Sequence, residues 1–298
     1  MIKLIKVIFL SMILISCGTK ENSGKKNSVK ENSKNNDVVK TDNDTSALSH
    51  YKLDSTVPQI LKLPPSLKEI SGITFTPDGR LFGMQDESSV VYQIDISSGE
   101  IIKKFAVGSS VMKGDFEDIE FVNGNFYLIK SNGDLYEFKE AGDNEYSDYV
   151  LHETELKQSF DVEGLCYDGK TNSLLLACKG NSGTGNADEK AIYSFSLDTK
   201  KLEPKPRFTI PLSGFKKEFN PSGIKKHPVK NTFFVIAANG NELIELSEDG
   251  IIIDRESLNP KIHEQPEGIA FSKNNELLIS NEGKSGKGYI VIYPYHVK

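Results

Sequence analysis

The feature that most constrains the fold of this chain is a short motif that occurs five times between Glu69 and the C-terminus. Each copy has a polar or acidic residue, Ser or Glu two positions later, a small residue next, and the start of an apolar strand. The copies are E-I-S-G-I-T-F, D-F-E-D-I-E-F, D-V-E-G-L-C-Y, N-P-S-G-I-K-K and Q-P-E-G-I-A-F, with Gly72, Asp118, Gly164, Gly223 and Gly268 as their fourth residues. The spacings of 46, 46, 59 and 45 residues are typical of β-propellers, in which each copy is one blade.

The first copy indicates how one blade is built. Apolar stretches at 71–75, 81–84, 90–96 and 101–107 alternate with turns rich in Pro, Asp, Ser and Gly, which favour tight reversals between strands. The last copy has only three such stretches, so we expect residues 57–63 to complete its sheet and hide an open edge. The sequence therefore predicts an all-β, five-bladed β-propeller of four-stranded antiparallel blades, closed by an N-terminal strand.

The residues before the first blade have the chemistry of a leader and a tether. Lys3 and Lys6 precede the apolar residues 7–15, as in a secretory signal, and the end of this stretch, L-I-S-C at Cys17, resembles the lipobox of bacterial lipoproteins. The resemblance implies that Cys17 is acylated and that lipid holds the mature chain on a membrane that it does not cross. The predicted division is 1–16 as signal peptide, 17–50 as acylated Cys and polar disordered tether, and 51–298 as propeller domain.

The charge of the chain and the residues near its start limit its expected partners and location. The formal net charge is −6, and the chain has no basic stripe with interleaved aromatic residues, so we expect no nucleic-acid partner. No acidic export tag follows Cys17, which favours the periplasm over the cell surface. We expect a lipid-anchored monomer of the bacterial cell envelope.

Two further cysteines fall in consecutive predicted strands of the third blade. A turn near residues 168–172 places Cys166 opposite Leu174 or Leu175 rather than opposite Cys178. A disulfide requires facing positions, so we expect two buried thiols.

The leader, the S/E-G-I/L-x-F/Y opening of most blades and the final Q-P-E-G-I-A-F copy together resemble the SdiA-regulated family of bacterial cell-envelope proteins, distant relatives of the NHL-repeat propellers. The resemblance covers roughly residues 55–298. It implies a five-bladed propeller and a calcium ion in the domain, and it implies no established activity.

Acidic side chains recur where the innermost strand of each blade begins. Strands of this kind surround the central channel of a propeller, so carboxylates there would repel one another unless a cation neutralises them. Calcium accepts several oxygen ligands in irregular geometry. We therefore expect a calcium site formed by Glu117, Glu163, Glu267, Asp118 and Asp86. The alternative for each acid is an ordinary role, in which it caps a strand end or pairs with Lys130 or Lys179.

Polar residues at the ends of the second strands form another predicted ring at the channel mouth. A mixture of acid, amine and amide groups suits a polar ligand, although any propeller mouth carries polar strand ends. The predicted ligand-binding residues are Lys130, Lys179, Asn239, Asn281, Glu282 and Asp161.

Two functions of different classes fit these patterns. The first is a non-catalytic module that binds a protein, glycan or small ligand at the cell envelope and uses calcium as a structural element. The second is a calcium-dependent hydrolase, by analogy with lactonase-like and phosphoesterase-like propellers, in which the ion polarises the substrate and Glu163 or Asp161 is the base. The chain has no G-x-S-x-G elbow and no evident Ser/His/Asp set, so the binding module is favoured.

Overall fold

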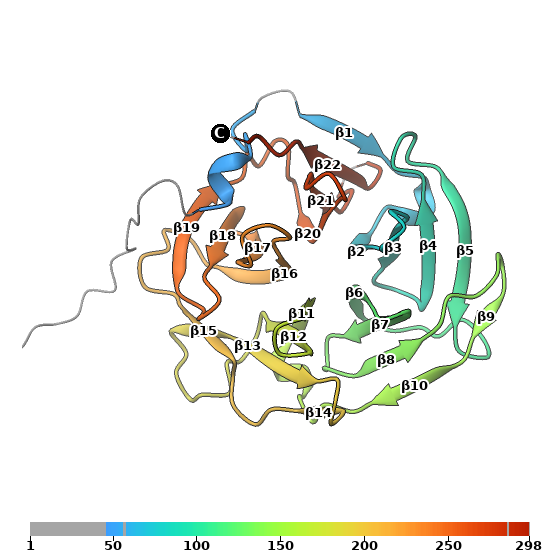
Figure 1. Ribbon diagram of the computed structural model, residues 1–298, viewed down its shortest axis with the longest axis horizontal. Coiled ribbons are helices and arrows are strands. Elements are labelled where there is room, and N and C mark those ends of the chain that lie inside the picture. Colours follow the sequence, from blue (N-terminus) through green and yellow to red (C-terminus); the bar gives the residue numbers. More distant parts are fainter. Residues whose placement is uncertain (1–45, 56–57, 285, 298) are drawn as a thin grey trace, which may run out of the picture. The chain divides into compact units, whose positions relative to one another are not determined.

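The computed structural model describes residues 46–55, 58–284 and 286–297, and these residues belong to one compact unit. Five separate sheets surround a central axis, and each sheet presents one strand to the centre of the ring (Figure 1). The predicted five-bladed β-propeller is therefore confirmed. The predicted signal peptide, Cys17 and most of the predicted tether lie outside the described residues.

Each blade is a twisted antiparallel sheet whose strands follow one another outward from the axis. The innermost strands, each of which carries one copy of the motif, are β2 (Ile70–Phe75), β6 (Phe116–Val122), β11 (Val162–Asp168), β16 (Asn220–Lys226) and β20 (Pro266–Phe271). The second strands are β3 (Leu81–Gln85), β7 (Asn125–Lys130), β12 (Ser173–Cys178), β17 (Phe233–Asn239) and β21 (Leu277–Asn281). The third strands are β4 (Val90–Ile94), β8 (Leu135–Phe138), β13 (Glu189–Ser196), β18 (Glu242–Leu246) and β22 (Tyr289–Tyr293). The outer strands are β5 (Ile101–Val107), β10 (Tyr149–His152), β14 (Lys201–Leu202), β19 (Ile252–Ser257) and β1 (Gln59–Lys62).

The ring closes as the sequence predicts. Strand β1 pairs antiparallel with β22, with Gln59 opposite Ile292 and Lys62 opposite Tyr289. The last sheet is thus completed by a strand from the start of the domain, and both ends of the ring are held by one hydrogen-bonded ladder. Residue 57, the first of the predicted closing segment, lies outside the described residues.

Two short strands go beyond the predicted pattern. Strand β9 (Tyr146–Ser147) pairs in parallel with β5 and so links the first blade to the segment before β10. The long third repeat contains β15 (Phe208–Pro211), which pairs with β13 as an additional outer strand of the third blade. The extra residues of that repeat therefore widen one blade and do not form a sixth.

The core consists of five apolar clusters, and each fills the space between two neighbouring blades. Burial of large apolar side chains between sheets is the main stabilising contribution expected for such a fold. Cys166 and Cys178 are buried free thiols, and Cys166 lies opposite Leu175. The prediction of two unpaired thiols is confirmed.

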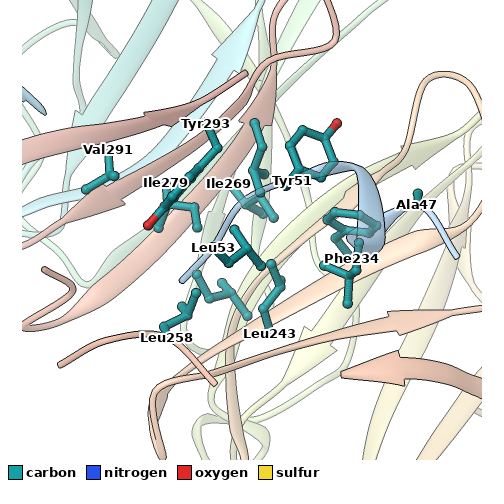
Figure 2. Close-up of a cluster of buried hydrophobic side chains, with 13 residues drawn as sticks. Ala47, Tyr51, Leu53, Phe234, Leu243, Leu258, Ile269, Ile279, Val291 and Tyr293 are labelled. Atoms are coloured by element: carbon teal, nitrogen blue, oxygen red, sulfur yellow. The ribbon is translucent and has the colours of Figure 1, made fainter. Parts of the chain in front are cut away.

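The predicted boundary between tether and domain at residue 51 differs from the structure. The short 3-10 helix η1 (Leu48–His50) already packs on the ring, with Leu48 1% exposed. Figure 2 shows Ala47, Tyr51 and Leu53 among side chains of the last two blades. The buried Glu245 accepts hydrogen bonds from the backbone N–H groups of Ala47 and Leu48, both at 3.0 Å. A polar stretch with few apolar residues gave no sequence signal for this docking.

The other two helices in the described part of the chain are single 3-10 turns before inner strands, η2 (Pro65–Leu67) and η3 (Gln158–Phe160). Among the described residues, no helix has the length and apolar character needed to span a bilayer.

Candidate functional site

Every innermost strand contains a β-bulge within its copy of the motif. The pairing register between the first and second strands of each blade shifts close to the third and fourth motif positions. A bulge adds an unpaired residue and re-aims the neighbouring side chains. The bulge is therefore the local reason that the third-position residues of different blades can turn toward one axis.

The fourth motif position brings neighbouring inner strands into close approach. A Cβ atom added to Gly268 would lie 2.3 Å from the carbonyl oxygen of Ser71, and one added to Gly223 would lie 2.4 Å from that of Glu267. Side chains at these positions would collide with backbone of the next blade, which explains why four of the five copies have Gly there.

Asp118 is the exception, and its side chain joins two blades. Its Oδ2 accepts a hydrogen bond of 2.7 Å from the backbone N–H of Leu165, on the inner strand of the third blade. Its Oδ1 accepts the N–H of Ile119 at 2.8 Å. Asp118 is 3% exposed, and burial raises its pKa to about 8. Both carboxylate oxygens serve the contact between blades, so the predicted metal-binding role of Asp118 is not supported by its placement.

Glu117, Glu163 and Glu267, which we call the axial glutamates, occupy the third motif position on β6, β11 and β20. Burial and the neighbouring charge of Glu163 raise the pKa of Glu117. Burial and the same neighbour raise the pKa of Glu267 to about 8. Glu163 is 6% exposed, whereas Glu117 and Glu267 remain partly accessible. The ring thus brings together three carboxylates that are separated by 46 and 104 positions in the sequence.

Lys179 is the cation of this cluster. Its Nζ lies 2.5 Å from Oε1 of Glu163. Burial nevertheless raises the pKa of Glu163, against the opposing effect of Lys179. Asp161 adjoins the pair, because its charge acts on both Glu163 and Lys179. Lys179 and Asp161, predicted as ligand-binding residues, therefore lie with the axial glutamates.

Asp86 has further acidic neighbours. Burial and the charges of Glu69 and Glu282 raise its pKa to about 6. Its Oδ1 is buried and has no hydrogen-bond partner within the described structure. The backbone carbonyl oxygen of Asp86 accepts a hydrogen bond of 2.8 Å from the N–H of Phe116, the residue before Glu117, and Glu282 acts on the pKa of both Asp86 and Glu267. Asp86 therefore lies at the same end of the inner strands as the axial glutamates.

The remaining residues of the predicted ligand ring do not share one environment. Lys130 lies over the ring of Phe116, with 5.6 Å from Nζ to the centroid. Asn239 is exposed at the end of β17. Asn281 is fully buried and lies 3.1 Å from the Nδ1 atom of His263. Its side chain is therefore part of the core and cannot meet a ligand at the mouth.

A polar contact farther along the inner strands was not predicted from the sequence. The Nζ atom of Lys225 on β16 lies 2.8 and 2.9 Å from the two carboxylate oxygens of Glu120 on β6. The side chains are only 14% and 6% exposed. Thr74 and the backbone N–H of Tyr167 also donate to Glu120. One carboxylate thus connects four blades. The sequence signal for this contact was the sixth motif position, which is occupied by Thr, Glu, Cys, Lys and Ala in the five copies.

The donor chemistry of the axial glutamates suits a hard cation, since carboxylates are its preferred ligands. Across the part of the chain that the structure describes, however, no three His, Cys, Asp or Glu side chains are gathered closely enough to form a ready metal site. Four surface depressions of about 310 to 530 Å³ are lined by other residues. The axial glutamates therefore have the oxygen ligands that calcium prefers, but they are not arranged in a complete coordination shell.

These features define the class of the protein as a five-bladed β-propeller with an acidic cluster on its inner strands. Residues 200–292 match the model of the SdiA-regulated family, which confirms the predicted resemblance over that segment.

Solved structures support the fold. One glucose dehydrogenase is 11% identical, with a TM-score of 0.54, and the alignment covers 78% of this chain and 99% of that one. A luciferin-regenerating enzyme is 10% identical, with a TM-score of 0.51 and coverage of 80% and 98%. A glutaminyl cyclase from Myxococcus xanthus is 11% identical, with a TM-score of 0.50 and coverage of 80% and 95%. At these identities the likeness concerns the fold alone. No curated protein sequence matches the chain.

Proposed function

We propose that this protein is a non-catalytic binding module of the bacterial cell envelope, and that the axial glutamates bind a positively charged group of its ligand. The observation that carries the proposal is the position of Glu163, whose charge raises the pKa of both Glu117 and Glu267 and whose carboxylate lies 2.5 Å from Nζ of Lys179. Buried neighbouring carboxylates repel one another when they are ionised, and a bound cation stabilises their ionised form. Calcium is one such cation, and an ammonium group of a ligand is another.

The hydrolase alternative receives less support from the placed residues. A hydrolase needs a free base near the reacting water. Glu163, one of the two predicted bases, is engaged by Lys179, and the charge of Asp161, the other, also acts on Lys179. Two buried histidines are engaged elsewhere: His263 contacts Asn281 and Tyr293, and His227 contacts Tyr51. These contacts favour a binding role for the cluster.

Calcium binding to the full chain tests the proposal. A bound cation must displace protons from Glu117 and Glu267, so binding should release protons and become tighter as the pH rises from about 6 to 9. Glu163→Gln should weaken binding by about tenfold or more, which is ~1.4 kcal/mol. Isothermal titration calorimetry in two buffers of different ionisation enthalpy measures both quantities, with calcium chloride and a short alkyl diamine as separate probes.

Glu100→Gln is the matched control, because Glu100 is an exposed acid on a turn of the first blade. It should bind both probes as the wild type does. Wild-type affinity in Glu163→Gln, or no binding of either probe at any pH, would refute a cation site at the axial glutamates.

We also propose that lipid on Cys17 holds the domain at a membrane, facing the periplasm. The support is the L-I-S-C sequence at the end of an apolar leader. In the native bacterium, Cys17→Ser should move the protein from the membrane fraction to the soluble fraction, as seen by fractionation and immunoblotting. Retention of the variant in the membrane fraction would argue against the lipid anchor.

A further inference from the structure

The outer strand of the second blade, β10, and the adjoining strand β9 carry a group of exposed apolar side chains. Tyr146, Tyr149, Val150 and Leu151 are 55%, 39%, 58% and 41% exposed. The other large exposed apolar residues of the described chain occur singly along the sequence. Single exposed apolar residues are ordinary, whereas a group of them marks an interaction surface.

Strand β10 is the outer strand of this blade and pairs only with β8 in its sheet. Figure 1 places its other edge at the periphery of the ring. An edge strand presents unpaired N–H and C=O groups to any other strand that approaches it.

The other blades protect their outer edges in ways that proteins commonly use. Strand β5 is covered by β9, and the third blade has two short outer strands, β14 and β15. Strand β19 carries the charged run D-R-E at 254–256, and β1 ends with Lys62. By contrast, Tyr149, Val150 and Leu151 carry no charge. Charged, covered or very short edges resist strand pairing, and β10 lacks these protections.

We propose that β10 is a dimerisation edge, at which two copies of this chain pair antiparallel about a two-fold axis at Val150. In this register Tyr149 lies opposite Leu151 of the second copy, so all three exposed apolar residues face apolar partners. Asp148 lies opposite His152, so no like charges meet. A shift of two residues in either direction would set Val150 against Asp148 or His152. The same strand thus complements itself, as an isologous interface requires.

A neighbouring depression gives the second copy a place to pack. It has a volume of about 320 Å³, and its lining combines Phe138, Tyr149 and Val150 with the polar residues Asn125, Glu137, Lys139 and Asp148. Aromatic and aliphatic cross-strand neighbours stabilise a paired edge. Confinement of both copies to one membrane would raise their effective concentration. The dimer does not depend on the axial glutamates, so either proposal can fail while the other holds.

Cross-linking of the full chain in detergent tests the register. Val150→Cys places two thiols opposite each other at the two-fold axis and should give a rapid disulfide-linked dimer under mild oxidation. Ile251→Cys is the matched control, because Ile251 is 57% exposed and lies in the turn before β19. Both variants retain Cys17, so any link through that residue appears equally in both. Equal cross-linking of the two variants would overturn the proposed register.

The oligomeric state gives a second test that does not rely on cysteine chemistry. The wild type should show a concentration-dependent monomer–dimer equilibrium by analytical ultracentrifugation. Val150→Lys, which puts like charges at the axis, should weaken dimerisation by about tenfold or more, and Ile251→Lys should leave it unchanged. Self-pairing would be refuted by a wild type that remains monomeric at its highest soluble concentration. A monomeric wild type whose β10 binds a strand of another protein would refute it as well.

Discussion

Replacement of Lys225 by Met should lower the free energy of unfolding by about 3 to 5 kcal/mol, because it leaves the nearly buried carboxylate of Glu120 without its cation. The pair joins inner strands of two blades across the axis, with both carboxylate oxygens within 2.9 Å of Nζ. Thr74 and the Tyr167 N–H continue to donate to Glu120, which places the expected loss toward the lower part of that range. Urea denaturation followed by circular dichroism measures it.

Two further variants distinguish the effect of breaking the Lys225–Glu120 pair from the effect of removing any lysine. Lys170→Met removes the exposed salt bridge between Lys170 and Glu248, whose side chains are 61% and 37% exposed, and should leave the free energy of unfolding close to that of the wild type. The double variant Lys225→Met/Glu120→Gln should be more stable than the sum of its single variants predicts, since both charges leave together. Additive losses would show that the pair does not couple the blades.

The second large effect concerns pH. Burial and neighbouring acids raise the pKa of Glu267 to about 8, far above the value of about 4.3 for an unfolded chain. Between these values the folded state holds more protons than the unfolded state, so stability must fall as the pH rises. This contribution is present in full below about pH 4.3 and is lost by the time the pH has passed about 8. Glu117 shifts in the same direction.

The expected result is that the cation-free wild type loses a few kcal/mol of unfolding free energy between about pH 5 and pH 9, at ~1.4 kcal/mol per unit of pKa shift. Glu267→Gln should flatten this dependence and stabilise the protein at pH 9. Glu100→Gln, the exposed control, should follow the wild type. Denaturation series at several pH values measure this dependence. If the unfolding free energy changes with pH equally in Glu267→Gln and the wild type, the raised pKa of Glu267 is not its cause.

The architecture could be predicted because short local sequence patterns determine it. Turn residues mark the strand ends, and five copies of one motif imply five equivalent sheets. The closing strand could be predicted because the last blade has only three apolar stretches of its own, and the pairing of β1 with β22 confirms it. The third motif position also led to the axial glutamates, whose charges the ring brings together.

The missed features depend on register and on contacts between distant segments. A bulge in each inner strand breaks the two-residue alternation of side chains, so counting along the sequence could not tell that Glu120 and Lys225 meet. Asn281 ends a strand, as predicted for a mouth residue, yet it turns into the core toward His263. The docking of residues 46–53 depends on Glu245, almost 200 positions away, and no local pattern indicates such a partner.

The proposed cation site requires that burial and the charge of Glu163 keep the pKa of Glu117 and Glu267 high. Nuclear magnetic resonance titration of 13C-labelled glutamate carboxyl groups in the cation-free protein measures these pKa values, with Glu267→Gln used to assign one resonance. We predict that the Glu267 resonance titrates near pH 8 and that added calcium or diamine moves its midpoint downward. A midpoint close to that of an exposed glutamate, unchanged by either cation, would contradict the account.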